Sequence, residues 1–427
     1  MLRRVVLITV IALGFLIAFI LGGKPAPVQG QVVQAPGIPE DNGQKGFQEQ
    51  YGQYLIVPNW PKPLPGNEGK WTWGSMQGIY AESANKVFIL QRGELPELKR
   101  PPNTAIPQFG PSLSFPVNAV PFRNHSQGVV ASPPNDAADR GLTKEGVDWR
   151  WRNTLFAVDR NGNLIEAWNQ WDSTFKRPHA VFISPYDREK HVWVVDDGRH
   201  AIFKFTNDGK KLALTIGTPN VQGNDDKHYG RPTFLAWLPD GTMFLTDGYA
   251  NTRVVKFDKD GKYLMAWGQK GNEGVGGGAM GNETRPGYFN TVHGLAIDPV
   301  ERRLYVSDRS NRRIQVFDEN GKFVDMWWVG HPPAHIYQLY MGTDRTLWGA
   351  DAGTNKMVQW DRNGKFLQSW GFLSESQGAL WCNHGISVDE EGNLYTSDVC
   401  KGVAQKFRPK TGAVQAKLVG KPVRSAW

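Results

Sequence analysis

"DKDGKYL" at residues 258–264, "DENGKFV" at 318–324 and "DRNGKFL" at 361–367 are three copies of one short pattern. In each copy Asp or Asn and Gly separate two apolar runs, and tight β-hairpin turns favour these residues because they need positive φ. Similar turns recur along the chain, and their glycines are Gly162, Gly209, Gly261, Gly321, Gly364 and, in a looser copy, Gly412. The pattern predicts six related hairpins.

Successive turn glycines are 47, 52, 60, 43 and 48 residues apart. A second hairpin lies upstream of each turn, as in "HGLAIDPVERRLYVSD" at 293–308. One unit is therefore four antiparallel strands in about 40–50 residues, a period typical of propeller blades. Six such units between residues 71 and 427 predict an all-β, six-bladed β-propeller.

Two insertions interrupt this period. Residues 95–150 are rich in Pro and lie within the first unit, and residues 269–290 are rich in Gly and join the third and fourth units. Long irregular connections are often lids or binding loops and otherwise spacers, and both interpretations stay open here. Residues 31–70 are a polar lead-in segment whose packing the sequence does not predict.

Residues 1–30 have the features of an export signal or of an N-terminal membrane anchor. Arg3 and Arg4 precede an apolar run that is long for a signal peptide and borderline for a membrane span, which needs about 20 apolar residues. In both cases we expect the body of the protein to be extracytoplasmic, either periplasmic or secreted. Cys382 and Cys400 could pair there or stay as free thiols.

The formal charge of +8 is spread along the chain without a dense Lys/Arg block. Nucleic-acid binding would need a clustered basic stripe, so we expect no nucleic-acid partner. A mild positive field instead favours acidic small substrates. The hydrophobic content of 40% and charged content of 21% fit a globular protein, which we expect to be a monomer.

Three separate segments place a histidine at the start of the innermost strand of a unit. They are "RPHAVFIS" (177–184), "TVHGLAID" (291–298) and "CNHGISVD" (382–389), in blades 2, 4 and 6, and the histidines are His179, His293 and His384. Blades 1, 3 and 5 carry Gln77, Thr233 and Tyr337 at that position. Alternate blades of a six-bladed ring lie a third of a turn apart, so the three imidazoles should converge on the central channel.

Three neutral nitrogen ligands with an open fourth position are what a catalytic Zn²⁺ site requires. The sequence therefore predicts a metal site made of the three histidines. The alternative is that each histidine begins a strand for turn and packing reasons alone.

The loops after the second strand of each blade should lie on the same face as the histidines, because the second strand runs back towards that face. These loops contain Arg92 in blade 1, Tyr249 in blade 3 and Arg309 in blade 4. A guanidinium can pair with a carboxylate through two hydrogen bonds, and positive charge beside a phenol favours the phenolate, which can act as a base. For each residue the alternative is an ordinary solvated or packed turn position.

Carboxylates recur at the end of the second strand in blades that otherwise differ. They are Asp247, Asp308, Asp351 and Asp398. Because they recur in unlike blades, we interpret them as structural acceptors for turn amides.

The units at residues 232–268 and 293–317 look like NHL repeats. More specifically, the chain resembles the peptidyl-α-hydroxyglycine α-amidating lyase family over about residues 75–420. The three histidine segments correspond to the zinc-histidine segments of the family. "VFILQRGE" (87–94) and "VSDRSNRRIQVF" (306–317) resemble its active-site arginine segments, and "TDGYANTRVVKF" (246–257) resembles its catalytic tyrosine segment.

The resemblance implies Zn²⁺ on His179, His293 and His384, Tyr249 as the catalytic base, and Arg92 and Arg309 as residues that hold a substrate carboxylate. It implies a carbon–nitrogen lyase that cleaves an N-acyl-α-hydroxyglycine, as a small molecule or a peptide, to an amide and glyoxylate. The family also binds a structural calcium through an Asp after its last zinc histidine. Gly385 stands at that position here, which argues against calcium.

Two other functions stay open. One is a non-catalytic NHL propeller that binds a protein or ligand outside the cytoplasm. The other is a different hydrolase or lyase on the same metal scaffold, for example a lactonase. Lactonase propellers usually bind their metal through carboxylate and amide oxygens, which suits three histidines poorly.

Overall fold

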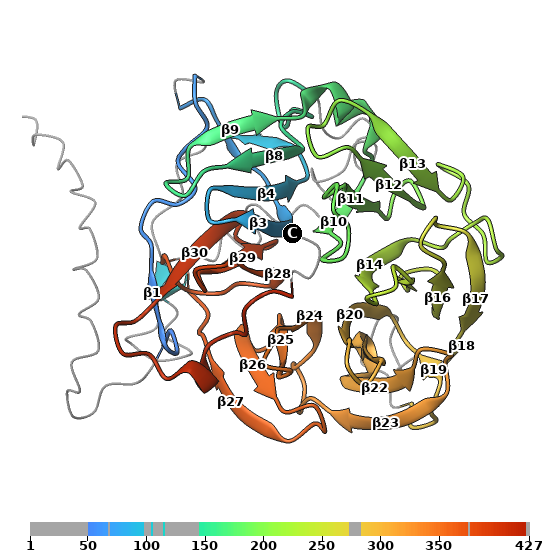
Figure 1. The fold of residues 1–427 in the computed structure, drawn as a ribbon. Helices are drawn as coiled ribbons and strands as arrows, with labels where there is room; N and C mark the ends of the chain where they lie inside the picture. The colour runs from blue at the N-terminus through green and yellow to red at the C-terminus, as the bar shows by residue number, and fades with distance from the viewer. Residues whose placement is uncertain are drawn as a thin grey trace, which may run out of the picture. The chain divides into compact units, whose positions relative to one another are not determined.

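The computed structural model describes residues 50–66, 69–97, 104–105, 114–115, 145–272, 283–374 and 376–423. Six four-stranded antiparallel sheets formed by these residues surround a central axis (Figure 1), which confirms the predicted six-bladed β-propeller. The predicted signal or anchor at 1–30 and most of the 95–150 insertion lie outside the described residues. Within the described ranges no helix is long and apolar enough to cross a membrane.

Blades 1 to 5 follow the chain from the innermost strand outwards. Blade 1 is β3 (Met76–Ser83), β4 (Lys86–Gln91), β8 (Leu155–Val158) and β9 (Leu164–Ala167), and blade 2 is β10 (Pro178–Ile183), β11 (Val192–Asp196), β12 (Ala201–Phe205) and β13 (Leu212–Ile216). Blade 3 is β14 (Pro232–Trp237), β15 (Met243–Asp247), β16 (Arg253–Phe257) and β17 (Tyr263–Trp267). Blade 4 is β20 (Val292–Asp298), β21 (Arg303–Asp308), β22 (Arg313–Asp318) and β23 (Phe323–Trp328), and blade 5 is β24 (Ile336–Met341), β25 (Leu347–Asp351), β26 (Lys356–Trp360) and β27 (Phe366–Trp370).

Blade 6 takes its outermost strand from the other end of the described chain. Its inner three strands are β28 (Asn383–Val388), β29 (Leu394–Asp398) and β30 (Val403–Pro409), and β1 (Tyr54–Ile56) pairs antiparallel with β30 (Figure 1). The sequence interpretation assigned the sixth turn to Gly412, but a short 3₁₀ helix, η5 (Gln415–Lys417), follows it in place of a strand. The lead-in segment therefore closes the ring.

The turn glycines serve both the turn and the contact between blades. Gly209, Gly321 and Gly364 have φ between 68° and 84°, and a Cβ on any of them would lie 2.5–2.7 Å from a Trp ring on the preceding blade. Gly52, two residues before β1, meets Trp370 of blade 5 in the same way, at 2.7 Å. Gly52 therefore makes in blade 6 the contact that these three turn glycines make in their own blades.

Short elements border the two insertions. β2 (Trp71–Trp73) pairs with β5 (Glu94–Pro96), and β6 (Thr104–Ala105) pairs with β7 (Ser114–Phe115). β18 (Gln269–Lys270) runs parallel to β19 (Tyr288–Phe289) at the base of the second insertion, whose residues 273–282 are not described. Two more 3₁₀ helices are η3 (Asn169–Thr174) and η4 (Arg309–Asn311).

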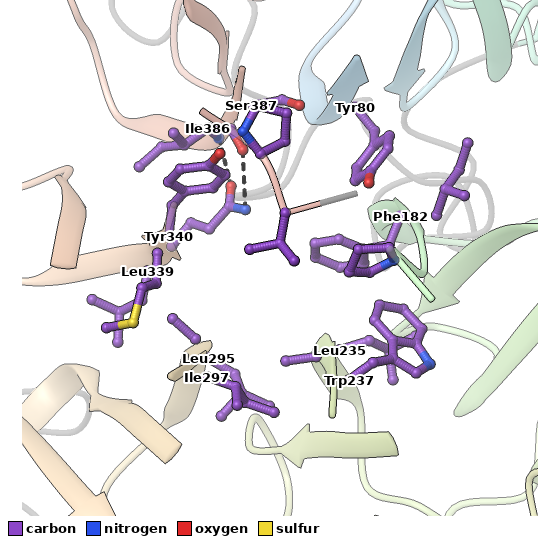
Figure 2. Close-up of a pocket in the computed structure, with 18 of the residues that line it drawn as sticks. Tyr80, Phe182, Leu235, Trp237, Leu295, Ile297, Leu339, Tyr340, Ile386 and Ser387 are labelled. Atoms are coloured by element: carbon purple, nitrogen blue, oxygen red, sulfur yellow. Dashed lines mark hydrogen bonds between the residues drawn. The ribbon is translucent and has the colours of Figure 1, made fainter. Parts of the chain in front are cut away.

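The inner strands also line an apolar depression of about 790 Å³, including its open mouth. Its walls come from the later residues of the inner strands, such as Phe182, Leu235, Leu295 and Ile386, and Pro422 and Val423 enter it as well (Figure 2). None of the three histidines lines this depression, because they stand at the other end of the same strands.

Candidate metal centre

A β-bulge begins every inner strand. In blade 2 the pairing of β10 with β11 shifts between Pro178 and Ala180, so His179 is the extra residue, and β20 and β28 shift around His293 and His384. Equivalent shifts surround Gln77, Thr233 and Tyr337 in the other three blades. Because a bulge turns its extra residue out of the regular alternation, the position is suited to aiming a side chain into the channel.

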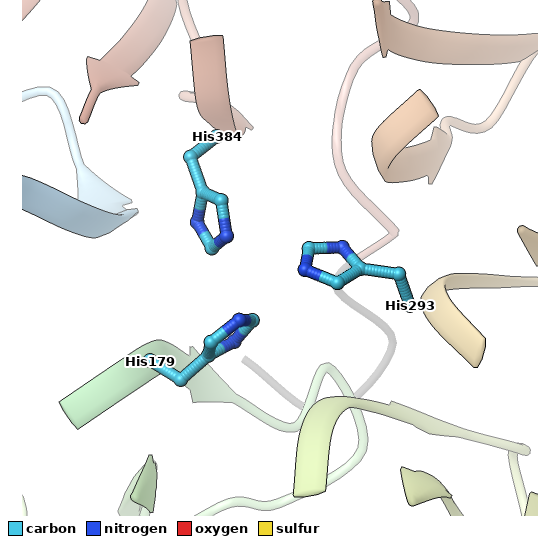
Figure 3. A group of neighbouring side chains, drawn as sticks. All are labelled: His179, His293 and His384. Carbon is cyan, nitrogen blue, oxygen red and sulfur yellow. The ribbon is translucent and has the colours of Figure 1, made fainter. Parts of the chain in front are cut away.

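The structure brings His179, His293 and His384 together on the channel axis (Figure 3). All three are buried, and one ring nitrogen of each lies within 4.8 Å of the others. A tetrahedral ion with metal–nitrogen bonds of about 2.1 Å holds its ligand nitrogens about 3.4 Å apart, so an inward movement of the rings by about 1 Å would let one ion bind all three. No other group of three His, Cys, Asp or Glu side chains in the described ranges has a geometry that could hold a metal.

Each imidazole is oriented by a main-chain carbonyl of the next blade. The Nδ1 atoms of His179, His293 and His384 lie 3.0, 2.7 and 2.6 Å from the carbonyl oxygens of Thr233, Tyr337 and Gln77, respectively. A carbonyl can only accept, so in the neutral ring Nδ1 carries the proton and Nε2 keeps its lone pair. Metal-binding histidines are commonly oriented in this way.

The environment keeps the three imidazoles neutral. Burial is the main cause that lowers the pKa of each, and the neighbouring imidazoles and the guanidiniums of Arg92 and Arg309 add to the effect. The pKa of His384 falls to about 3. Its Nε2 is buried and has no hydrogen-bond partner within the described structure. An unused lone pair on a neutral buried nitrogen is a donor available to a metal ion.

Tyr249 and Arg309 lie directly against the histidines. The Tyr249 hydroxyl is 3.1 Å from His179 Nε2 and 2.9 Å from His293 Nε2, and Arg309 Nη1 donates to the same hydroxyl at 3.3 Å. Burial acts to lower the pKa of Arg309, but Tyr249 and Tyr337 outweigh it and raise that pKa. The guanidinium is therefore charged beside the phenol.

Arg92 contacts the backbone beside His179. Its Nε donates to the carbonyl of Pro178, the residue before His179, and its Nη2 is 3.6 Å from the carboxylate of Asp197. Burial, together with the charge of Arg177, lowers the pKa of Arg92 to about 9. The structure therefore brings together all six residues that the sequence singled out, and their roles remain predictions.

Phe234 and Asp197 at the centre were missed, and Tyr337, which the sequence placed at the channel position of blade 5, was given no role. The Phe234 ring packs against all three imidazoles, with centroids 5.1–5.4 Å apart, and Tyr337 packs against His293 and His384. Asp197 directly follows the last residue of β11, which is the place that Arg92 has after β4 and Arg309 has after β21. That shared position was visible in the sequence and could have identified Asp197.

The recurrent carboxylates are structural, as predicted. Oδ1 of Asp247, Asp308 and Asp351 accepts the backbone N–H of Gly230, Asn290 and His335, respectively, just before an inner strand. Asp398 accepts the backbone N–H of Lys401 and of Trp381.

Blade 6 contains a disulfide between Cys382 and Cys400, with Cα atoms 5.5 Å apart, so the paired alternative is confirmed. It joins the residue before β28 to the loop after β29, close to His384. Gly385 has no room for a side chain, since a Cβ there would lie 2.1 Å from Ser397 Oγ.

Comparison with known proteins gives partial matches to an NHL repeat model and to several curated proteins. Residues 289–317 match the NHL repeat family. Peptidyl-glycine alpha-amidating monooxygenase A of Xenopus laevis is 32% identical over 183 residues, which are 42% of this chain and 18% of that protein. Peptidyl-alpha-hydroxyglycine alpha-amidating lyase 1 of Drosophila melanogaster is 30% identical over 232 residues, 48% of this chain and 41% of that protein.

NHL repeat-containing protein 3 of Mus musculus is 31% identical over 233 residues, 52% of this chain and 60% of that protein. The aligned region spans less than two thirds of each of these three relatives. The matched NHL segment contains His293 and Arg309. The chain is a six-bladed β-propeller that contains an NHL repeat and is similar over part of its length to peptidyl-α-hydroxyglycine α-amidating lyases.

Proposed function

We propose that this protein is a zinc-dependent lyase that cleaves an N-acyl-α-hydroxyglycine to an amide and glyoxylate. The observation that carries the proposal is the meeting of three neutral, buried imidazoles with a phenol and a guanidinium at one point of the channel. The amidating-lyase names of relatives at about 30% identity support the reaction class.

His179, His293 and His384 would hold the zinc ion through their Nε2 atoms. The unused Nε2 of His384 and the proton held on each Nδ1 fit this role. A bound zinc ion supplies Lewis-acid stabilisation of a negatively charged oxygen.

Tyr249 would accept the proton of the substrate hydroxyl, since its own oxygen lies beside two of the ligand nitrogens. Arg309 holds that phenol oxygen, and Arg92 and Arg309 provide positive charge for the glycine carboxylate. As the carbon–oxygen double bond of glyoxylate forms, the carbon–nitrogen bond breaks and the amide nitrogen takes up a proton. The reaction is redox-neutral.

The main alternative is a non-catalytic binding propeller. The mouse relative, which aligns with the largest share of this chain among the three described, is named only for its NHL repeats. This alternative predicts neither stoichiometric zinc nor glyoxylate release.

The test is zinc content and glyoxylate release from N-benzoyl-α-hydroxyglycine, measured on the purified full chain. We expect about one zinc per chain, glyoxylate release that a chelator abolishes, and loss of both zinc and activity in His293→Ala. His331→Ala is the matched control, because this histidine is exposed and lies outside the centre. A zinc-loaded protein that releases no glyoxylate would exclude the proposed reaction.

We also propose that the protein acts outside the cytoplasm, as a monomer that its N-terminal segment can tether to the membrane. The Cys382–Cys400 disulfide supports an oxidising compartment. Cell fractionation with thiol labelling tests the location, and detection in the cytoplasm with both thiols reduced would overturn it.

A further inference from the structure

A group of four charged side chains from blades 1, 2 and 3 contains more positive charge than the proposed reaction needs. The buried carboxylate of Asp197 lies 3.6 Å from Arg92 Nη2, 3.1 Å from Arg177 Nε and 3.4 Å from Arg231 Nη2. These four residues, here called the arginine cluster, contain three positive charges and one negative charge. The neighbouring Asp196 is also buried, but its oxygens accept the backbone N–H groups of residues 176, 177, 198 and 199.

The cluster is in contact with the candidate metal centre. The Arg231 guanidinium lies 4.7 Å from the centroid of the Tyr249 ring, and the hydroxyl of that ring lies 2.9 Å from His293 Nε2. Arg92 Nε donates a hydrogen bond to the carbonyl of Pro178, the residue before His179. Only one side chain therefore separates Arg231 from the ligand nitrogens.

Burial divides the cluster into an inner and an outer part. The side chains of Arg92 and Asp197 are 2% and 0% exposed, whereas those of Arg177 and Arg231 are 26% and 33% exposed. An arginine needed only to balance Asp197 could be buried like Arg92. The side chains of the outer pair are instead partly exposed beside the site.

The backbone places this outer pair at matching positions. Arg177 and Arg231 each directly precede the proline that begins an inner strand. Arg231 adopts φ of 60°, in the left-handed region that non-glycine residues rarely adopt. A Cβ on Gly198 would lie 2.6 Å from the Cβ of Arg177, so Gly198 leaves room for a side chain at position 177. The fold therefore holds Arg231 beside the centre in an unfavourable backbone conformation.

We propose that Arg177 and Arg231 form a second anion-binding subsite that takes a carboxylate on the acyl half of the substrate. The inference rests on the proposed lyase function and narrows its substrate class to N-acyl-α-hydroxyglycines with an acidic acyl group. In this arrangement Arg92 and Arg309 serve the glycine carboxylate, and the outer pair serves the acyl carboxylate. Two arginines can hold a carboxylate through charge-assisted hydrogen bonds.

The experiment compares two substrates that differ by one carboxylate, N-benzoyl- and N-(4-carboxybenzoyl)-α-hydroxyglycine. We expect the wild-type protein to favour the acidic substrate about tenfold or more in kcat/KM, because hydrogen bonds to charged groups stabilise by about 1.5–3 kcal/mol. The preference should decrease as salt increases. Arg177→Gln with Arg231→Gln should abolish it. Arg231→Lys, which retains the charge, should keep part of it.

Lys210→Gln is the control, because that lysine is 83% exposed on the outer turn of blade 2. The control should retain the full preference. An equal rate for both substrates in the wild-type protein, or an equal loss for both in the double variant, would overturn the subsite. Circular dichroism of each variant distinguishes a lost subsite from a lost fold.

Binding measurements separate this inference from the proposed reaction. Calorimetry with benzoylglycine and 4-carboxybenzoylglycine, which lack the reactive hydroxyl, should show tighter binding of the second compound in the wild-type protein only. Tighter binding of 4-carboxybenzoylglycine without glyoxylate release from either hydroxyglycine substrate would support the subsite and exclude the lyase reaction. Equal binding of both compounds would reject the subsite whatever the activity.

Discussion

A bulge at the start of all six inner strands presents one residue to the channel from each blade. A register shift recurs around His179, Thr233 and Tyr337, and a histidine stands there in three of the six blades only. The blades without a histidine contribute to the site through their main chain. The carbonyls of Thr233 and Tyr337 accept hydrogen bonds from Nδ1 of His179 and His293. Three blades thus supply the histidine side chains, and the three blades between them supply the carbonyls that orient those side chains.

The buried histidines should make the metal-free protein sensitive to acid. The folded pKa of His384, about 3, lies below its ordinary value of about 6.5, so the unfolded chain binds the proton more readily. The stability contributed by this group is complete above about pH 6.5 and is lost as the pH falls towards 3, by up to about 1.4 kcal/mol per pH unit.

Urea denaturation of chelator-treated protein from pH 4 to 7 measures how the free energy of unfolding changes with pH. His384→Asn lacks the titrating group, so its free energy of unfolding should fall less steeply than that of the wild-type protein as the pH decreases. Parallel curves for the two proteins would contradict the assignment.

Tyr249→Phe tests the chemistry at a single atom. Removing the hydroxyl should reduce kcat for N-benzoyl-α-hydroxyglycine by about 10²–10⁴-fold, the usual contribution of a general base. Zinc content should not change, because the three imidazoles remain. Tyr263→Phe on the outermost strand β17 is the control, and a Tyr249→Phe enzyme of normal rate would rule out this base.

At the scale of elements, the sequence predicted the strands and turns better than the contacts between blades that hold them in place. The turns around Gly209, Gly321 and Gly364 were identified because Asn-Gly and Asp-Gly signals act within a few residues. The Trp rings that pack on these glycines belong to the preceding blade, so no local pattern shows them. The histidines, Tyr249 and the two arginines were found through their repeat positions. Arg177 and Arg231 were missed because their common partner, Asp197, lies 20 or more residues away in the chain.

The disulfide should stabilise the hairpin that begins with His384. Cys382 and Cys400 close a loop of 18 residues, and a loop of that size lowers the entropy of the unfolded chain by the equivalent of about 3 kcal/mol. Replacing both cysteines by serine should therefore lower the free energy of unfolding by about 2–4 kcal/mol. Denaturation with and without reductant checks this, since reductant should weaken the wild-type protein and leave the variant unchanged.

At the scale of the whole molecule, the ring is closed by a segment that precedes the first blade. Tyr54 of β1 is fully buried, and its hydroxyl accepts the backbone N–H of Val419 from the C-terminal part of the chain. Without β1, strand β30 would expose an unpaired edge. Contacts between the first and last parts of the chain therefore hold the propeller together.

A chain that begins at residue 58 should be much less stable than one that begins at residue 50. The shorter chain loses Gly52 and Tyr54, and truncation of one buried aromatic alone costs about 3–5 kcal/mol. Thermal and urea denaturation measure the difference. Tyr54→Ala should reproduce most of it in the longer chain, whereas Val300→Ala, at a residue 69% exposed, should have little effect. Equal stability of the two chains would show that β1 is dispensable.

The sequence by itself determined the number of blades, the turns between the outer strands of blades 1 to 5 and the three blades that contribute a histidine. These features depend on turn chemistry and on a repeat period, which act between near neighbours. Only the tertiary structure decided that β1 closes blade 6, that three carbonyls orient the imidazoles, and that Arg231 lies on Tyr249. These contacts join residues far apart in the chain, and their geometry exists only once the six blades have packed into a ring.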